Sequence, residues 1–362
     1  MRILKGRTIL MEFQKGWKGF TIFFLIVVIV AGGMAQLYPT VSETFEGDKV
    51  EGGDLVHLET EEDIIHLSWV RLDEAQEYVV IEDRASHMAT SWEVNRTVDN
   101  STIIQRSEDD ERYFAVIAII DGERVPVGMT STVERKDLLE EMMDTPYFRM
   151  FTAGRSDLRM DEMEGFLSVE VFSWWILLVG VYLGYLSVKS ITEDYEDSRM
   201  DIIFSTPLSR KQYLIEKFSA LALFTLSMLV LSGLVLTLSV YSVGASERLE
   251  FGTYLVSILI SWPMFLVIIA VSIFFSVLFK NSRAAVGATF TVILIQYAFF
   301  MAGHMLESLE PILPLTISYY WDYNAVLLDG VVHYWHLILL IVTSVSLIVG
   351  SLILFEDSDI PV

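Results

Sequence analysis

Apolar residues in this chain gather into long blocks that short polar segments separate. Six blocks hold about 20 predominantly apolar residues each, the length that a helix needs to cross roughly 30 Å of hydrocarbon. They cover approximately residues 20–37, 169–188, 218–243, 254–278, 284–305 and 335–355. The pattern predicts an α-helical membrane protein with six transmembrane helices.

A polar region of about 130 residues separates the first two blocks and is long enough to bury a core of its own. From residue 54 to 136 its apolar residues alternate, as in strands with one buried face. Several short strands at this spacing predict an all-β sandwich inserted between the first and second helices. The expected strands are 65–69, 78–81, 102–104, 113–119 and 125–133, with a turn at Asp121-Gly122.

Two of these strands resemble a fibronectin type III domain. That family places a tryptophan on an early strand, as in Leu67-Ser68-Trp69. It places an alternating run led by tyrosine on a late strand, which residues 113–118 resemble. The resemblance implies a spacer or a binding module rather than a catalyst.

The polar region ends in a segment of different character, residues 137–168. Its methionines and phenylalanines recur with helical spacing between charges, which predicts an amphipathic helix over 137–165. The helix lies in the outer membrane interface or packs on the sandwich, and the pattern leaves both open. The expected domains are a tail with the first helix (1–37), the sandwich (38–136), this connector (137–168) and a five-helix membrane domain (169–362).

Charge predicts how the helices are oriented. Five basic residues and one acid precede the first block, which places the N-terminus in the cytoplasm by the positive-inside rule. Residues 38–165 hold 31 acids and 12 bases, a net charge of −19 out of −23 for the chain. Six helices then make both termini cytoplasmic and residues 38–168 extracellular in a plasma-membrane protein. The acidic exterior fits a solvated surface, cation attraction or a saline habitat, and no nucleic-acid partner is expected.

The first block has a second interpretation, as a signal peptide, because a basic start precedes it and Gly33-Met34-Ala35 resembles a cleavage site. Its length favours a retained transmembrane helix. The chain has no cysteine, so the sandwich is expected to be held by its core rather than by disulfides. Two sequons, at Asn95 and Asn100, are candidate glycosylation sites on the outer domain.

A polar loop, residues 189–217, joins the second and third blocks and carries the candidate site. Thr192 is placed to cap a helix over 193–201, with acids in its first turn. Residues 202–204 would form an apolar patch, the proline that follows would end it, and Ser209 would cap the next helix. The pattern predicts a helix parallel to the membrane and tied to two transmembrane helices.

This loop resembles a segment of the permease subunits of ABC exporters of the type-two class. In that family, acids precede Gly-Thr-Leu-Glu and two or three leucines, followed by Ser-Thr-Pro-Leu-Ser-Arg and a lysine. Residues 205–210 and Lys217 match this pattern, while Ser198 and Arg199 stand where the family has Gly-Thr. Six helices and a large loop after the first also fit the family, as does the C-terminal run of Phe355, Asp359 and Ile360.

The resemblance implies the membrane-spanning subunit of a transporter, which hydrolyses no ATP itself. Two permease subunits, as a homodimer or a heterodimer, would pair with two ABC ATPase subunits that bring ATP and Mg, and the permease would lie in the lipid bilayer. The loop helix would act as a coupling helix in a groove of the ATPase. The residues implied for this contact are Asp194, Glu196, Arg199, Asp201, Ile202, Phe204, Pro207 and Arg210.

We do not expect this chain to catalyse a reaction by itself. The sequence has no Gly-x-x-x-x-Gly-Lys-Ser/Thr phosphate loop, so we expect no ATP binding, no enzymatic activity, no cofactor and no catalytic or metal site. Gln296, polar within the fifth block, is a candidate pathway residue, although a helix–helix hydrogen bond is the simpler interpretation. The expected function is that of an ATP-driven exporter permease. The alternative is a non-transporting sensor or adhesion protein whose outer domain binds a ligand.

Overall fold

The computed structural model describes residues 7–45, 56–61, 64–72, 74–83, 91–105, 112–131, 145–155, 157–160, 162–244 and 252–357. The chain divides into two compact units. One is a helical unit of Met1–Thr40 and Thr145–Val362, and the other is a β unit of Val41–Asp144. The β unit is therefore inserted after the first helix of the helical unit.

Six helical stretches in the described residues are long and apolar enough to cross a membrane, in agreement with the six apolar blocks. The first lies in α1 (Arg7–Phe45), and the second runs without a break from Met163 to Glu196. This second helix consists of α4 (Met163–Leu167), the π-helical η2 (Ser168–Phe172), α5 (Ser173–Trp175), the π-helical η3 (Ile176–Gly180) and α6 (Val181–Glu196). The other four are α8 (Arg210–Val243), α9 with α10 (Gly252–Leu259 and Trp262–Phe279), α11 (Ser282–Met305) and α13 (Tyr334–Glu356).

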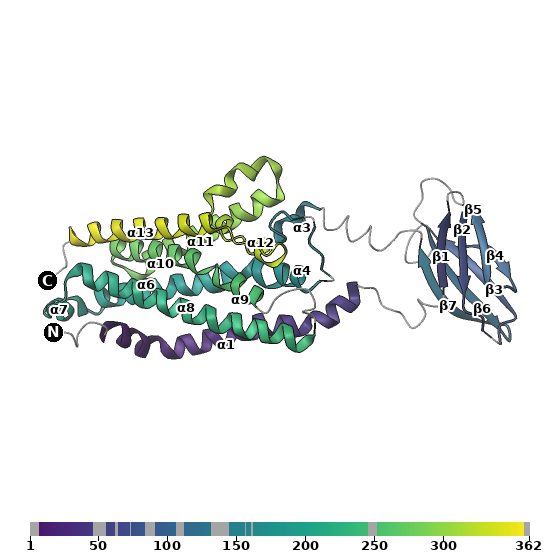
Figure 1. Cartoon of the computed structure of the whole chain (residues 1–362), viewed down its shortest axis with the longest axis horizontal. Helices are drawn as coiled ribbons and strands as arrows, with labels where there is room; N and C mark the ends of the chain where they lie inside the picture. Colours follow the sequence, from purple (N-terminus) through teal and green to yellow (C-terminus); the bar gives the residue numbers. More distant parts are fainter. Residues whose placement is uncertain are drawn as a thin grey trace. The chain divides into compact units, whose positions relative to one another are not determined.

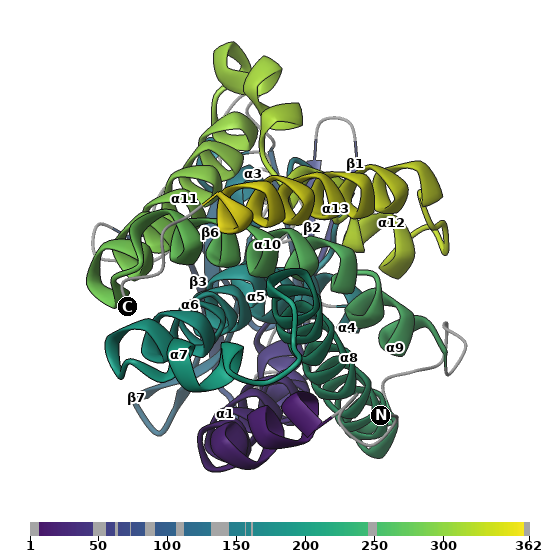
Figure 2. The ribbon, with the colours of Figure 1, turned by 90° about the vertical axis from the view of Figure 1, so that its left-hand side faces the viewer.

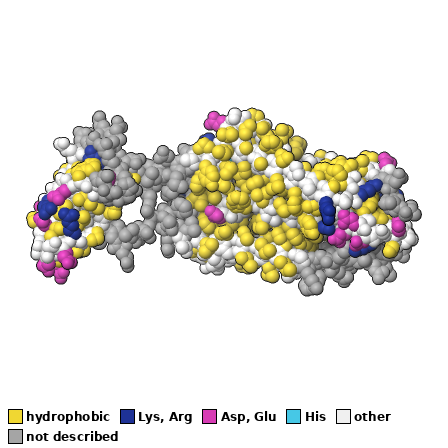
Figure 3. Space-filling view, turned by 180° about the vertical axis from the view of Figure 1, so that it is seen from behind, with side chains coloured by type: hydrophobic (Ala, Val, Ile, Leu, Met, Phe, Trp, Pro, Cys, Tyr) yellow, Lys and Arg dark blue, Asp and Glu magenta, His cyan; other side chains and the backbone are white. Residues whose placement is uncertain are grey.

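Helix α10 lies at the centre of the helical unit, with α6, α8, α11 and α13 packed around it (Figures 1 and 2). It is apolar on all sides, as a helix surrounded by other helices should be. Hydrophobic side chains cover the outer surface of the unit, and charged side chains gather at the end that carries α7, Arg199–Phe204 (Figure 3). This distribution fits a multi-pass membrane protein whose ends lie in water.

The stretch between α11 and α13 folds back into the helical unit. It contains the 3-10 segments η4 (Glu307–Leu315) and η5 (Ser318–Tyr320), followed by the short helix α12 (Tyr323–Leu327). All five residues of α12 are buried. Most of η4 is exposed and only its Leu313 is buried, so α12 is the part that is packed into the unit. The stretch forms no seventh membrane-crossing helix in the described residues.

The β unit consists of two antiparallel sheets around one core. Their strand orders are β1-β2-β5 and β4-β3-β6-β7. Trp69 and Tyr78 meet edge to face in the core with ring centroids 5.5 Å apart, and the Tyr78 hydroxyl accepts a hydrogen bond from the Leu72 amide at 2.7 Å. The strands are β1 (Val56–Glu61), β2 (Ile64–Trp69), β3 (Glu77–Asp83), β4 (Trp92–Thr97), β5 (Ser101–Gln105), β6 (Tyr113–Ile120) and β7 (Glu123–Ser131).

Five of these strands fall where alternation predicts them, whereas β1 and β4 carry few apolar residues and were not predicted. Strand β6 is apolar on both faces. Phe114, Val116 and Ala118 fill the core, so the alternating set that begins at Tyr113 lies on the outer face. The expected end of the last strand, residues 132 and 133, lies outside the described residues.

The connector differs from the single amphipathic helix that the sequence predicts. Residues 137–144 lie outside the described residues, and from residue 145 onward the chain belongs to the helical unit. Thr145 caps a helix of only six residues, α3 (Pro146–Phe151). Ala153 and Gly154 then both take positive φ angles, which breaks the helix, and the second membrane-crossing helix already begins at Met163.

Candidate functional site

The loop between α6 and α8 contains one short helix, α7, whose start differs from the prediction. Helix α6 continues to Glu196. The buried Thr192 hydroxyl donates to the Val188 carbonyl at 3.0 Å and lies 2.7 Å from the Ser282 hydroxyl of α11. Thr192 therefore is not an N-cap, and the helix expected over 193–201 is wrong. The tertiary contact with α11 keeps the residue inside α6.

The break between α6 and α7 occurs at Ser198 instead. Its φ of 54° is left-handed, a conformation that costs a non-glycine residue roughly 1–2 kcal/mol. The exporter family that this loop resembles has glycine here, which adopts the same turn without that cost. At the other end of the loop, Ser209 caps α8 as predicted, in a reciprocal pair of hydrogen bonds with Gln212.

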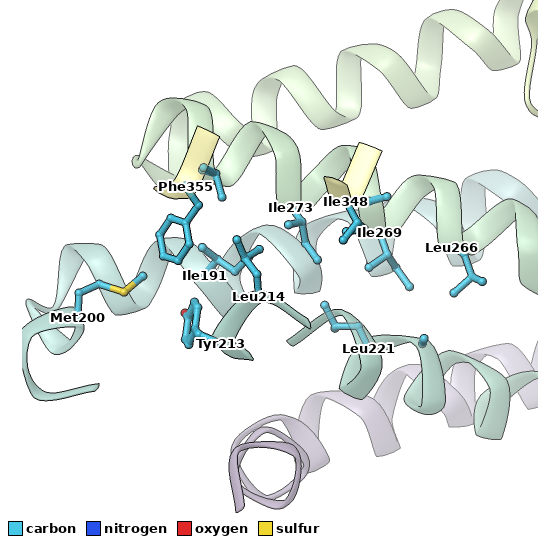
Figure 4. Packing of buried hydrophobic residues seen from close by; sticks show 13 residues of the cluster. Ile191, Met200, Tyr213, Leu214, Leu221, Leu266, Ile269, Ile273, Ile348 and Phe355 are labelled. Atoms are coloured by element: carbon cyan, nitrogen blue, oxygen red, sulfur yellow. The ribbon is translucent and has the colours of Figure 1, made fainter. Parts of the chain in front are cut away.

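One face of α7 is packed into a buried apolar cluster (Figure 4). Met200 is buried, and Ile203 and Phe204 pack against the same cluster. The Phe204 ring lies 5.8 Å from that of Tyr213 in α8 and 6.1 Å from that of Phe355 in α13. The helix is thereby attached to two membrane-crossing helices besides α6.

Below this face lies a buried ion pair between Asp194 of α6 and Lys217 of α8. The Lys217 ammonium is 3.0 Å from Oδ2 of Asp194 and donates to the Ser190 carbonyl at 2.7 Å. The Tyr213 hydroxyl donates to the same Oδ2 at 2.7 Å. On its other oxygen, Asp194 lies 3.6 Å from the guanidinium of Arg199 in α7. The Asp194 and Lys217 side chains are 7% and 2% exposed, so each charge depends on these partners.

Two further contacts attach the loop to neighbouring helices. Glu196 accepts hydrogen bonds from the Ser282 amide at 2.7 Å and from the Ser282 hydroxyl at 3.0 Å, at the first turn of α11. Arg210 donates to the carbonyls of Phe355 and Glu356 at 3.1 and 3.0 Å, at the end of α13. A cation at a helix C-terminus is favoured by the helix dipole.

The opposite face of α7 is exposed. Ile202 is 71% exposed, although it is a large apolar residue at the charged end of the unit. Asp201 lies beside it, and the turn that follows, Ser205-Thr206-Pro207, is exposed as well. This face is short, partly apolar and supported from behind by the packed face, as a docking surface for another protein requires.

The structure therefore separates the eight residues expected to contact an ATPase into two groups. Asp201, Ile202 and Pro207 lie on the exposed face. The other five bond or pack within the helical unit: Asp194, Glu196, Arg199, Phe204 and Arg210. Arg199 also bonds Asp197, so its guanidinium is held between two carboxylates.

Gln296 is buried in α11. Its carbonyl oxygen accepts hydrogen bonds from the Ser318 hydroxyl at 3.0 Å and the Ser318 amide at 3.3 Å, and its amide donates to the Ile293 carbonyl at 3.2 Å. These contacts attach η5 to α11. A role in a transport pathway stays a prediction.

The two sequon asparagines lie around the turn between β4 and β5. The Asn95 amide bonds the Thr102 hydroxyl, and the Asn100 amide donates to the Trp69 carbonyl at 3.1 Å. Both amide nitrogens thus take part in the β unit's own hydrogen bonding, and glycosylation at either position stays a prediction. Within the described residues, no group of three or more potential metal ligands comes together.

Sequence reasoning missed the partnership of Asp194 with Lys217 and Tyr213. A lysine seven residues inside a predicted helix start looks like an ordinary boundary charge. The available signal was its position directly before the third apolar block, because a charge that faces a bundle of apolar helices requires a partner from another helix.

These observations define a multi-pass membrane protein with an anchored surface helix at one end. A family model described as ABC-2 family transporter protein matches residues 15–359. The chain belongs to this family and is a permease of an ABC transporter, which implies association with an ABC ATPase. Comparison with curated proteins and with solved structures found no match.

Proposed function

We propose that this permease is driven by ATP hydrolysis in separate ATPase subunits, and that it exports its substrate. The observation that carries the proposal is the two-faced α7. Its inner face packs on α8 and α13, and its outer face presents Ile202 and the turn at Pro207. A partner docked on the outer face would therefore displace several membrane-crossing helices rather than a flexible loop.

The nucleotide chemistry belongs to the partner in this proposal. The sequence has no phosphate loop, so ATP and Mg would be held by the ATPase, and the permease itself would have no enzymatic activity. Two copies of the permease, or this chain with a second permease, would pair with two ATPase subunits. A permease without ATPase activity needs a rigid connection between the ATPase and its membrane-crossing helices, and the anchored α7 provides one.

We place α7 and both termini in the cytoplasm and the β unit outside the cell, in the plasma membrane. Bases outnumber acids before the first helix, and the inserted unit is strongly acidic. The ends of α1 and α13 nearest the termini lie at the same end of the helical unit as α7 (Figure 1). An ATPase docked there would meet the cytoplasmic supply of ATP.

The β unit is proposed to be a fibronectin type III-like module that acts as a spacer or binds a partner outside the cell. Its three-strand and four-strand sheets enclose the Trp69–Tyr78 contact, and Phe114 lies in the same core. Family membership makes this module an addition to a transporter, which disfavours a non-transporting sensor or adhesion protein.

Copurification tests the proposed function. The tagged chain, extracted from its native membranes, is expected to bring down an ATPase with a phosphate loop. Ile202→Glu should reduce the amount recovered about tenfold or more, since a central apolar contact in an interface is worth about 2 kcal/mol. Val98→Glu is the matched control, because Val98 is 65% exposed in the β unit. Wild-type chain that recovers no ATPase, or an Ile202→Glu variant that recovers as much as wild type, would contradict the proposal.

A further inference from the structure

We propose that the buried pair of Asp194 and Lys217 is a positioning device that fixes the orientation of α7 relative to α6 and α8. The inference rests on the proposed function, because it explains how motion of a docked ATPase reaches the membrane-crossing helices. Without the pair, motion of a docked ATPase would rotate α7 and leave α6 and α8 in place.

The geometry assigns this role because one carboxylate joins three helices. Asp194 belongs to α6 and bonds Lys217 of α8 through Oδ2, while its Oδ1 faces Arg199 at the start of α7. The Tyr213 hydroxyl adds a second bond from α8 to Oδ2. The Tyr213 ring in turn contacts Phe204 at the end of α7. Tyr213 is thereby linked to both ends of α7, to the start through Asp194 and to the end through the Phe204 ring.

Helix α7 needs such support because it is short. Six residues form less than two turns, and an isolated helix of that length is not stable in water. It is flanked by the left-handed Ser198 and by the turn that contains Pro207. Its position is therefore set by contacts with other helices and not by its own hydrogen bonds.

Stability alone does not explain a charged pair at this place. Buried ion pairs are often no more stable than well-packed apolar residues of similar volume, because desolvation opposes the Coulomb attraction. A buried carboxylate with partners on three helices does constrain their geometry, because its charge has to stay close to all of those partners. We infer that the role of the pair is the alignment of α7.

The same helix offers a matched comparison. Lys211, six residues before Lys217, lies 3.1 Å from Glu356, and these side chains are 57% and 47% exposed. The double variant Lys211→Met/Glu356→Gln therefore removes one ion pair with the same chemistry at the same end of the unit. It leaves the contacts of Asp194 unchanged.

The first measurement is the alignment of α7 in the permease alone. The chain has no cysteine, so spin labels can be placed without background at Ile202→Cys and at Ala284→Cys, an exposed position in the first turn of α11. We expect one narrow distance distribution in the otherwise unchanged chain and in the Lys211→Met/Glu356→Gln control. The neutral pair Asp194→Asn/Lys217→Met should broaden the distribution.

The second measurement is ATP hydrolysis in the complex with the copurified ATPase. The neutral pair should still bind the ATPase, because Asp201, Ile202 and Pro207 are unchanged. Its effect on the ATPase rate should fall by about fivefold or more, the lower range of coupling between distant sites. The single variant Lys217→Arg, in which Asp194 is unchanged, should keep the coupling that the neutral pair loses. Its guanidinium can still bond Asp194 and the Ser190 carbonyl.

Tyr213→Phe keeps the apolar packing and removes only the hydroxyl bond to Asp194. It is the variant for both measurements if the neutral pair does not fold. It should broaden the label distance and weaken coupling in the same direction. A narrow distribution with full coupling in the neutral pair or in Tyr213→Phe would overturn the inference, as would loss of ATPase binding by a folded neutral pair. A wild-type chain that binds no ATPase would refute the proposed function, and the label distances would still decide the alignment of α7.

Discussion

The two ends of the second membrane-crossing helix are built differently. At its Glu196 end, charged side chains hold α7 and leave one face of it exposed. At its Met163 end, hydrogen bonds among buried polar groups close the chain on itself. The Asn324 amide donates to the Thr152 carbonyl at 2.9 Å, and the Ser168 hydroxyl donates to Asn324 at 2.6 Å. The Glu196 end exposes one face of α7 on a packed support, whereas the Met163 end buries its polar groups against each other.

The largest loss of stability should come from breaking the ion pair between Asp194 and Lys217 at the Glu196 end. Lys217→Met leaves the Asp194 carboxylate buried without its ammonium partner, which typically costs about 3–5 kcal/mol. We expect a corresponding fall in the unfolding midpoint of the detergent-solubilised chain. The neutral pair Asp194→Asn/Lys217→Met should recover most of the loss. Equal midpoints for Lys217→Met and wild type would mean that the ion pair does not form.

A smaller loss is expected from tight packing at the Met163 end. A Cβ at Gly165 would lie 1.9 Å from the Arg159 carbonyl oxygen, so Gly165→Ala requires backbone movement. Overpacking of this kind costs about 1–3 kcal/mol. Gly287→Ala is the control within a helix, because a Cβ there meets nothing within 4 Å. The control should be neutral or slightly stabilising in the same unfolding assay, and a similar loss in both variants would contradict the packing described here.

The smallest effect concerns the partly exposed contact between Arg155 and Asp329. Arg155 donates to Asp329 at 2.7 and 3.2 Å, and this bonding holds the pKa of Asp329 below its usual range. A lowered folded pKa stabilises the fold above the ordinary carboxyl value of about 4 and ceases to do so as pH falls through the folded pKa. Asp329→Asn should therefore cost under about 1 kcal/mol at neutral pH. The difference from wild type should vanish in strongly acidic buffer, and a difference that grows there would be inconsistent with this pair.

Local pattern predicted the membrane-crossing helices well, because each has its own apolar block. It failed at Thr192, where an acidic first turn resembles a helix start although a contact with Ser282 of α11 keeps α6 continuous. The family resemblance located the loop but did not separate its anchoring residues from its exposed ones. The position of Lys217 beside an apolar block indicates that its charge needs a partner, but that the partner is Asp194 depends on how α6 and α8 pack.

The β unit shows the same limit. Residues whose alternation predicts β6 lie on its outer face, because the strand is apolar on both sides and periodicity alone cannot choose between them. Strands β1 and β4 became visible only through pairing with β2 and β3.

Site-specific photo-crosslinking tests most directly whether the exposed face of α7 meets an ATPase. A single cysteine at Ile202, labelled with a photoreactive group in native membranes, is compared with one at Val98 of the β unit. If α7 docks on an ATPase, light should produce an adduct between position 202 and a phosphate-loop ATPase, and none from position 98. No ATPase adduct from position 202, under conditions where the label is shown to react, would contradict it.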